Sequence, residues 1–509
     1  MRGQSLEMKG KMIKIVLDDW ATLLRSFVMV AMCRLCCAVW ALVLVMSASV
    51  WAEDPAHYTQ LSFQDLPDWE ALEPQRFSLD NGAQLLVLEN HELPLVQIRI
   101  LLRTGEVMVP KGKEGLGEVF AQAMRSGGCA SYPGNALNTL LEQRAARLSV
   151  SVNFASTEIR LNFLRQDLQE LLAMLGDFLA NPLFPEDKIF LAKKHALTRI
   201  ARRNDDQQAV TFREFKRMVY GPESVYGRLP QVETVQGITR EDLVIFHERS
   251  FGSANMLLGV VGDVQAKKVK DLVRGILAPL PTAERMELTF PPVKGASSAH
   301  TLFLDMPDVN QVSILMGHLG GRRQSPDYPA LQVMNAILSQ GFSSRLFENL
   351  RTRKGLAYSV YGQFGSKALY PGVFLAGLKT KSSNLARATK ALRAELVRLQ
   401  EEGVTEEEVQ RAKQEFLNSL VFRYDTPREI LSRHMYYAYR DMPADSFDRL
   451  IRKVKNVQTT EISRAAREHI QPDNMQVLMV GNQDQVREDL EAFEGIQVRQ
   501  VKDLSSSGD

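Results

Sequence analysis

The order of apolar and polar segments predicts hairpins that alternate with helices. Two apolar runs within 76–88 flank Asn81-Gly82, a pair typical of tight hairpin turns. Residues 115–125 form a predicted helix, which Gly127-Gly128 stops. The remaining predicted elements are helices at 136–148, 168–179 and 185–203, a strand at 96–102 and two alternating strands within 148–163. This order predicts an α+β fold with antiparallel hairpins rather than a regular βαβ fold.

An internal repeat predicts two homologous halves. In the first copy, Asp242-Leu243 precedes a segment that ends in Val261-Gly262-Asp263. In the second copy, Glu461-Ile462 precedes, at the same spacing, a segment that ends in Val480-Gly481-Asn482. Each copy predicts a helix, a polar turn and a strand that ends at glycine. Each half is therefore expected to be an antiparallel-rich sheet packed with helices.

The same patterns set the expected boundaries, with Pro291-Pro292 in the connection between the halves. The predicted parts are a signal peptide at 1–52, a polar leader at 53–74, an N-terminal domain at 75–281, a linker at 282–298, a C-terminal domain at 299–501 and a disordered tail at 502–509.

Composition narrows the function classes. The 509 residues are enough for two or more domains, and 62 basic against 60 acidic residues give a formal net charge of +2. A nearly neutral chain is not expected to have nucleic acid as its main partner. Glycines 317, 320 and 321 lack the loop context and the lysine of a phosphate-binding loop, which argues against nucleotide binding.

The N-terminus predicts export. Arg25 and Arg34 precede an apolar run at 35–46, and small residues at Val50 and Ala52 fit cleavage after Ala52. The run is short for a membrane span, so we expect a periplasmic or secreted protein without a stable span after processing, with an uncleaved anchor as the alternative. Translation can also begin at Met29 or Met32.

Cysteine use agrees with a core that has no disulfide. Three of the four cysteines lie inside the predicted signal peptide, and the mature chain keeps only Cys129. No His lies near Cys129 in sequence to suggest a nucleophile, so Cys129 is predicted to be a small buried residue.

The segment Gly115–Gly128 resembles the helix that carries the inverted zinc motif, H-x-x-E-H, in the insulinase/pitrilysin family of zinc peptidases. In that motif two His ligands share one helix face and the Glu between them activates the zinc-bound water. The resemblance places the two His at Glu118 and Gln122 and the catalytic Glu at Ala121. It places the family's third ligand, a Glu on a later helix, at Phe190. It therefore implies a chain that holds no catalytic zinc.

A second resemblance lies in 343–358, which contains Ser343-Ser344-Arg345-Leu346-Phe347 and ends in Gly355-Leu356-Ala357-Tyr358. In the family, the residues that match Arg351 and Tyr358 reach from the second half to the catalytic half, where they hold the substrate backbone and stabilise the reacting carbonyl oxygen. The resemblance extends over nearly all of the mature chain and implies two halves that face each other like a clam.

Each of these residues also has a simpler interpretation. Glu118 and Gln122, at i and i+4, can form a solvated or hydrogen-bonded helix face instead of a metal site. Arg351 can end a helix as a cation that suits the helix dipole, and Tyr358 can be an ordinary strand residue. The basic run Lys193, Lys194, Arg199, Arg202 and Arg203 is predicted to be a solvated face.

The resemblance implies a substrate-binding subunit that is inactive alone. Its partner would be a family member that brings the zinc motif and forms a periplasmic heterodimeric endopeptidase with it, so that zinc is expected in the partner and peptide is the substrate. The alternative is a stand-alone peptide-binding or scaffold protein, such as a homodimer, with no peptidase partner.

Overall fold

The computed structural model describes residues 72–505 except 283 and 297. These residues belong to one compact unit, Ala71–Asp509. The predicted signal peptide and residues 53–71 of the predicted leader lie outside the described residues. No helix of the described part is long and apolar enough to cross a membrane.

The first half builds a six-stranded sheet that is antiparallel except for the parallel pair β2 and β6. In spatial order its strands are β1 (Gln75–Ser78), β2 (Gln84–Glu89), β6 (Met256–Gly262), β3 (Leu95–Leu102), β5 (Thr157–Leu164) and β4 (Arg147–Val152). The helices of this half are α2 (Leu116–Gly127), α3 (Asn135–Gln143), α4 (Leu168–Ala180), α5 (Glu186–Arg202), α6 (Gln207–Tyr220), α7 (Val232–Gln236), α8 (Arg240–Ser250) and α9 (Ala266–Leu277).

The second half builds a sheet with matching order. Its strands are β10 (Ser359–Phe364), β12 (Val373–Lys381), β8 (Gln311–Leu319), β13 (Gln476–Gly481), β7 (His300–Asp305) and β14 (Gln497–Gln500), and a two-stranded pair joins β9 (Gly321–Arg322) to β11 (Ser366–Lys367). The helices are α10 (Tyr328–Ser339), η5 (Phe347–Arg353), α11 (Leu385–Glu402), α12 (Glu406–Arg423), α13 (Pro427–Tyr439), α14 (Ser446–Asn456), α15 (Thr459–His469) and α16 (Arg487–Leu490).

The predicted α+β class and the repeat are confirmed by this topology. The two copies of the repeat form α8 followed by β6 and α15 followed by β13, and both strands lie third from the same edge of their sheets. The outermost strand at that edge comes from the N-terminal end of the first half (β1) but from the C-terminal end of the second half (β14). The two halves therefore have the same strand order across the whole sheet, although their edge strands come from opposite ends of each half.

Most predicted elements were found close to their expected bounds, and Gly82 adopts a φ of +83° in the predicted hairpin turn. The predicted helix at 136–148 is too long, because α3 ends at Gln143. Ala145 has a φ of +47°, which no helix accommodates, and the chain then enters β4.

The tail at 502–509 is also corrected at its start. Residues Val501–Ser505 form a 3-10 helix instead of disordered chain. Val501 is buried among apolar residues of the second sheet, and its carbonyl accepts a hydrogen bond from the Asn204 side chain at 3.1 Å. Residues 506–509 lie outside the described part.

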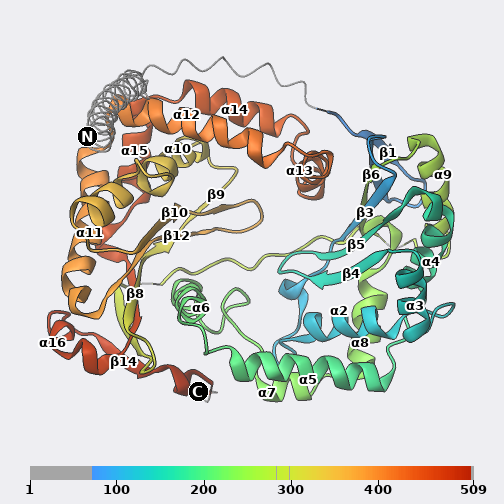
Figure 1. Cartoon of the computed structure of the whole chain (residues 1–509), viewed down its shortest axis with the longest axis horizontal. Helices are drawn as coiled ribbons and strands as arrows, with labels where there is room; N and C mark the ends of the chain where they lie inside the picture. The colour runs from blue at the N-terminus through green and yellow to red at the C-terminus, as the bar shows by residue number, and fades with distance from the viewer. Residues whose placement is uncertain (1–71, 283, 297, 506–509) are drawn as a thin grey trace, which may run out of the picture. The chain divides into compact units, whose positions relative to one another are not determined.

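One helix of each half packs on the sheet of the other half. Helix α6 of the first half lies on β8 and β13, where Val210, Phe215 and Val219 meet apolar residues of the second sheet. Helix α13 of the second half lies on β2 and β6, where Ile430, Leu431 and Met435 meet the first sheet. Figure 1 shows both helices on the sheet faces opposite to those covered by each half's own helices.

Tyr439 fastens the end of α13 to the first sheet. Its buried hydroxyl lies 2.9 Å from the Leu102 carbonyl oxygen and 2.7 Å from that of Ala155. Burial raises the pKa of this phenol above its ordinary value, so the hydroxyl stays protonated and remains a donor.

We expect Tyr439→Phe to lower the free energy of unfolding by about 1–2 kcal/mol, because a buried hydrogen bond between the halves is lost. Denaturant unfolding of the purified chain measures this loss. Tyr358→Phe is the matched control, because Tyr358 is 48% exposed and no hydrogen bond of its hydroxyl is described among residues 72–505. Equal stabilities of the two variants would contradict the anchoring role.

Candidate functional site: a zinc-motif helix without donors and an exposed Arg/Tyr segment

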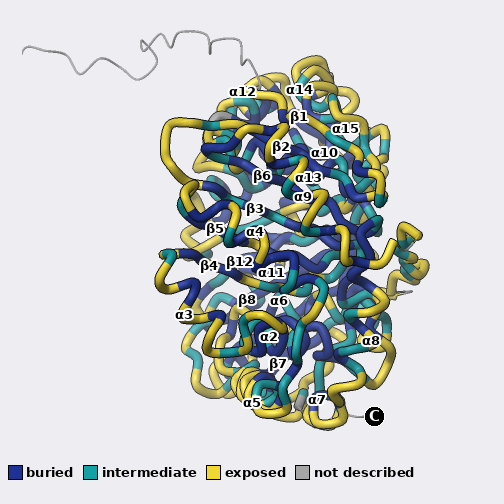
Figure 2. The backbone as a smooth tube through the Cα atoms, turned by 90° about the vertical axis from the view of Figure 1, so that its right-hand side faces the viewer, coloured by how far each residue is buried: buried dark blue, intermediate teal, exposed yellow. Residues whose placement is uncertain are grey.

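Helix α2 carries three of the four positions that resemble the zinc motif, and it packs against α5. The two helices run antiparallel, because Gly127 at the end of α2 approaches Pro185 before α5, whereas Glu118 near the start of α2 pairs with Arg199 near the end of α5. Figure 2 shows α5 as a largely exposed helix on the surface.

The face of α2 that would hold metal ligands is occupied by a polar network. The Gln122 side-chain amide lies 3.5 Å from the Glu118 carboxylate, at the limit of a hydrogen bond. The Arg199 guanidinium forms an ion pair with the same Glu118 oxygen. Ala121 is buried and its side chain has no polar atom. The simpler interpretation of Glu118 and Gln122, a hydrogen-bonded helix face, is thus supported by these contacts.

The structure does not bring Phe190 to this network. Phe190 is 70% exposed and precedes Arg199 by nine residues, which corresponds to roughly 13 Å along a helix axis. The residue of α5 that faces Glu118 is Arg199. The correspondence of Phe190 to the third ligand stays a prediction, because it rests on the sequence match alone.

The predicted solvated basic face of α5 holds for Lys194, Arg199 and Arg202, which are exposed, but not for Lys193 and Arg203, which are only partly exposed. Arg199 pairs with Glu118 across the helix interface. The Lys193 amino group donates to the carbonyl oxygens of Gln236 and Ile238, and Arg203 donates to that of Pro230. These cations bind carbonyl groups near α7 and an acid on α2. Because these partners are distant in sequence, no local sequence pattern indicated the contacts.

The residues at this position do not fit a zinc ion. Structural and catalytic zinc sites use imidazole, thiolate and carboxylate ligands, usually three or four of them. Here one carboxylate and one amide remain, and the carboxylate already has a guanidinium as its cation. A fixed positive charge beside a site with so few donors disfavours any divalent cation.

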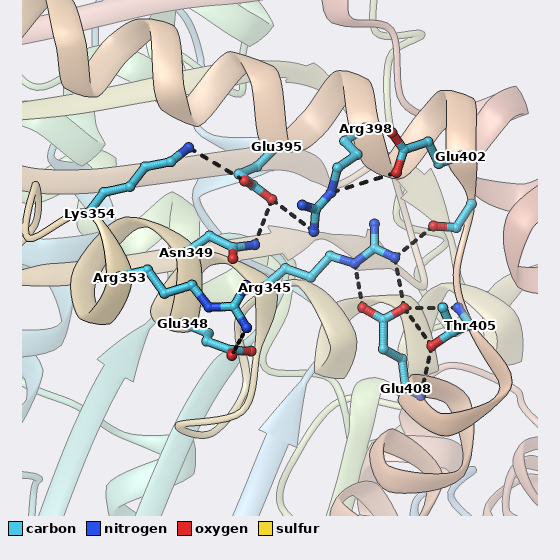
Figure 3. Close-up of polar contacts among 11 residues, drawn as sticks. Arg345, Glu348, Asn349, Arg353, Lys354, Glu395, Arg398, Glu402, Thr405 and Glu408 are labelled. Atoms are coloured by element: carbon cyan, nitrogen blue, oxygen red, sulfur yellow. Dashed lines mark hydrogen bonds and ion pairs between the residues drawn. The ribbon is translucent and has the colours of Figure 1, made fainter.

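The Arg/Tyr segment is built on an ion pair between buried Arg345 and half-buried Glu408 (Figure 3). Arg345, just before η5, is only 7% exposed and forms a two-pronged contact with Glu408, with Nε and Nη2 at 2.6 and 2.7 Å from the two carboxylate oxygens. Its Nη2 also donates to the Gly403 carbonyl oxygen at 2.8 Å. Burial would raise the pKa of Glu408, but the hydrogen bonds from Arg345 and Thr405 outweigh it and hold the pKa below its ordinary value.

A buried acid, Glu395, holds η5 on α11. The Glu395 side chain is 5% exposed and accepts a hydrogen bond from the Asn349 amide at 2.9 Å. Arg398 and Lys354 lie on the same carboxylate at 3.3 and 3.9 Å (Figure 3). The two networks fix both ends of η5 on α11 and on the start of α12, so the segment is a preorganised element rather than a free loop.

Arg351 and Tyr358 project from this fixed segment. A backbone hydrogen bond of 2.8 Å from Leu356 to Leu350 closes the turn between them, and the Tyr358 amide is bound to Lys379 of β12. Both side chains are exposed. The Arg351 guanidinium lies 4.7 Å from the centre of the Phe347 ring, and within residues 72–505 no ion pair of Arg351 is described.

Cys129 is buried, as predicted, and burial raises the pKa of its thiol to about 12. It is therefore a neutral thiol at physiological pH and no candidate nucleophile.

Comparison with known protein families agrees with these features. The description "Insulinase (Peptidase family M16)" matches residues 85–227, which include the degenerate zinc motif. The description "Peptidase M16 inactive domain" matches residues 237–416, which include Arg351 and Tyr358. Together the two matches span more than half of the chain, and the chain belongs to the insulinase (M16) peptidase family. Within it, the chain is a homologue of the inactive type, since it lacks the residues of the zinc motif.

Individual relatives support the family assignment. The "Non-peptidase homolog YmxG" of Helicobacter pylori is 24% identical over 412 residues, which cover 79% of this chain and 93% of that protein. An "Uncharacterized zinc protease" of Rickettsia felis is 24% identical over 348 residues, covering 67% of this chain and 82% of that protein.

Solved structures support the fold. A peptidase M16 inactive domain from Pseudomonas fluorescens matches with a TM-score of 0.73 and 22% identity, over 81% of this chain and 98% of that one. The first half of the periplasmic protease PqqL from Escherichia coli matches with a TM-score of 0.70 and 18% identity, over 84% and 95%.

We expect Zn²⁺ to leave the thermal unfolding of the isolated chain unchanged, because the ligand set is incomplete. A metal at 100 times its dissociation constant would stabilise the fold by about 2.7 kcal/mol. Elemental analysis and melting curves with zinc or a chelator measure this. A saturable stabilisation that is lost in Glu118→Gln, together with one zinc per chain, would contradict it.

A second prediction concerns the Arg345 anchor. Arg345→Lys keeps the charge but loses the planar fork, and we expect it to lower the free energy of unfolding by roughly 2–3 kcal/mol. Arg353→Ala is the control, because its ion pair with Glu348 is exposed and such pairs contribute under about 1 kcal/mol. The anchor assignment fails if both variants unfold at the same denaturant concentration.

Proposed function

We propose that this chain is the non-catalytic, substrate-binding subunit of a heterodimeric zinc endopeptidase of the M16 family. One observation carries the proposal: this chain has the Arg/Tyr pair that resembles the family's substrate-contacting residues, but it lacks the His and Glu residues of the zinc motif. At the zinc-motif positions on α2, Glu118 and Gln122 form a polar network with Arg199. Arg351 and Tyr358, in contrast, are exposed on a segment that half-buried Glu408 and buried Glu395 fix in place. Fixed donors for which no hydrogen-bond or ion-pair partner is described among residues 72–505 are expected where they serve a reacting group that another subunit holds.

The partner would be a family member that supplies the zinc ligands and the general base. Arg351 offers a planar fork of donors and Tyr358 a phenol, and both suit a peptide carbonyl on which negative charge develops. We place the pair in the periplasm, since the N-terminal residues have the pattern of an export signal. Export and pairing both belong to the proposal.

The test is steady-state kinetics of the reconstituted pair, with the zinc-bearing relative that co-purifies with the chain from its native source. Arg351→Ala and Tyr358→Phe should each lower kcat of the pair, by on the order of a hundred-fold if they stabilise the oxyanion. A rise in KM with unchanged kcat would instead assign them to ground-state peptide binding.

Arg353→Ala is the matched control, because Arg353 lies two residues from Arg351 and pairs with Glu348 of its own segment. It should leave kcat unchanged. Full activity of an assembled Arg351→Ala pair would exclude donated residues. A chain that co-purifies with no zinc-bearing relative would favour the stand-alone peptide-binding or scaffold protein.

A further inference from the structure

The face of the first sheet on which α13 packs carries two rows of polar side chains that include several arginines. The strand register aligns Arg147, Asn162 and Gln97 in one row and Ser149, Arg160 and Arg99 in the next. Their sequence neighbours Leu148, Leu161 and Ile98 belong to the core on the opposite face. Because side chains alternate along a strand, both polar rows point away from that core.

Helix α13 covers only part of this face. Gly259 lets it approach closely, since a Cβ at this position would lie 2.2 Å from the Met435 sulfur. Beside the helix remains a cavity of about 300 Å³, with Ile98, Val261, Leu431 and Met435 among its apolar lining. Its polar lining consists of Gln97, Arg99, Arg160, Asn162, Arg428 and Ser432, with Glu429.

The cavity has more cationic donors than its own acids use. Glu158 is buried and accepts the Nε donors of two lining residues, Arg99 and Arg160, through one oxygen, each at 2.5 Å. Glu429 is hydrogen-bonded by the Thr426 hydroxyl at 2.9 Å. Three guanidinium groups, counting Arg428, therefore face two carboxylates. In the described part of the chain no partner is described for the Nη atoms of Arg99 and Arg160 or for the amides of Gln97 and Asn162.

This arrangement suits a carboxylate. A guanidinium fork binds a carboxylate through two parallel hydrogen bonds, and apolar walls strengthen such contacts by excluding water. The planar Nη donors together with two side-chain amides can satisfy both oxygens of the bound group. Glu158 keeps the arginines in place, because its single buried charge joins their two Nε atoms.

We propose that this cavity binds a carboxylate of the peptide, from an acidic side chain or from the C-terminus. The inference that the natural ligand is a peptide rests on the proposed function. The cavity adds which peptides would bind: those with an acidic side chain or those bound through their C-terminal carboxylate. The site is separate from the Arg351 and Tyr358 segment and is formed jointly by β3, β5 and β6 of the first sheet and by α13.

The test is fluorescence anisotropy of three labelled decapeptides with the purified chain, without a partner. The peptides differ only at one internal position and at the C-terminus. The first has an internal Glu and an amidated C-terminus, and the second has Gln at that position and a free C-terminus. The third, which is neutral at both places, has Gln and an amidated C-terminus. At least one carboxylate-bearing peptide should bind about ten-fold or more tightly than the neutral one, and the difference should shrink with added salt. Which peptide gains identifies the source of the carboxylate.

Arg160→Gln and Arg428→Gln should each reduce that preference to less than about three-fold. Arg428 lies in the exposed first turn of α13, so its variant keeps the fold even if Arg160→Gln disturbs Glu158. Arg249→Gln on α8 is the control for the same change of charge at an exposed position outside the cavity. Melting curves confirm that each variant is folded.

Equal binding of all three peptides would overturn the proposal. So would a preference that survives both cavity variants, or one that Arg249→Gln lowers as strongly, because either result would indicate general charge attraction. The isolated chain is measured here, so the absence of a peptidase partner does not affect the outcome. Conversely, loss of this site leaves the kinetic test of Arg351 unchanged.

Discussion

The reciprocal exchange of one helix between the halves is the interaction on which the rest of the structure depends. Each sheet has two faces, and its own helices bury only one of them. Helix α13 buries part of the other face of the first sheet through Leu431 and Met435, and α6 does the same for the second sheet through Phe215. Apolar burial on both faces makes the halves one compact unit, and it defines which parts of the inner faces stay open to a ligand.

The two sites follow from how charge is distributed over this frame. On α2 a position that resembles a metal ligand of the family holds an ion pair, since Arg199 supplies the positive charge that Glu118 would otherwise share with a cation. Around η5, half-buried Glu408 and buried Glu395 have their charges compensated by basic side chains, which fixes the segment that carries Arg351. The ion pair on α2 therefore leaves no charge for a metal, whereas the ion pairs around η5 hold an exposed arginine in a fixed position.

The same frame explains why the basic cavity exists. Parts of strands β3 and β5 that α13 leaves uncovered border the cavity beside this helix, and Glu158 holds two of the arginines that line it. Had α13 covered the whole inner face, Arg99 and Arg160 would be buried with one acid between them, at a large desolvation cost. An open cavity avoids this cost and leaves donors for a ligand.

The sequence by itself determined the class of fold, the repeat and the loss of the zinc motif. Those features are local: Asn81-Gly82 requires a hairpin turn, and Glu118, Ala121 and Gln122 share one helix, so their spacing alone shows that His and Glu are missing. Only the tertiary structure decided the partners of Arg199, Arg345 and Arg99, because each pairs with an acid from another element. A charged residue looks the same in sequence whether it faces water or a distant carboxylate, and packing alone chooses between them.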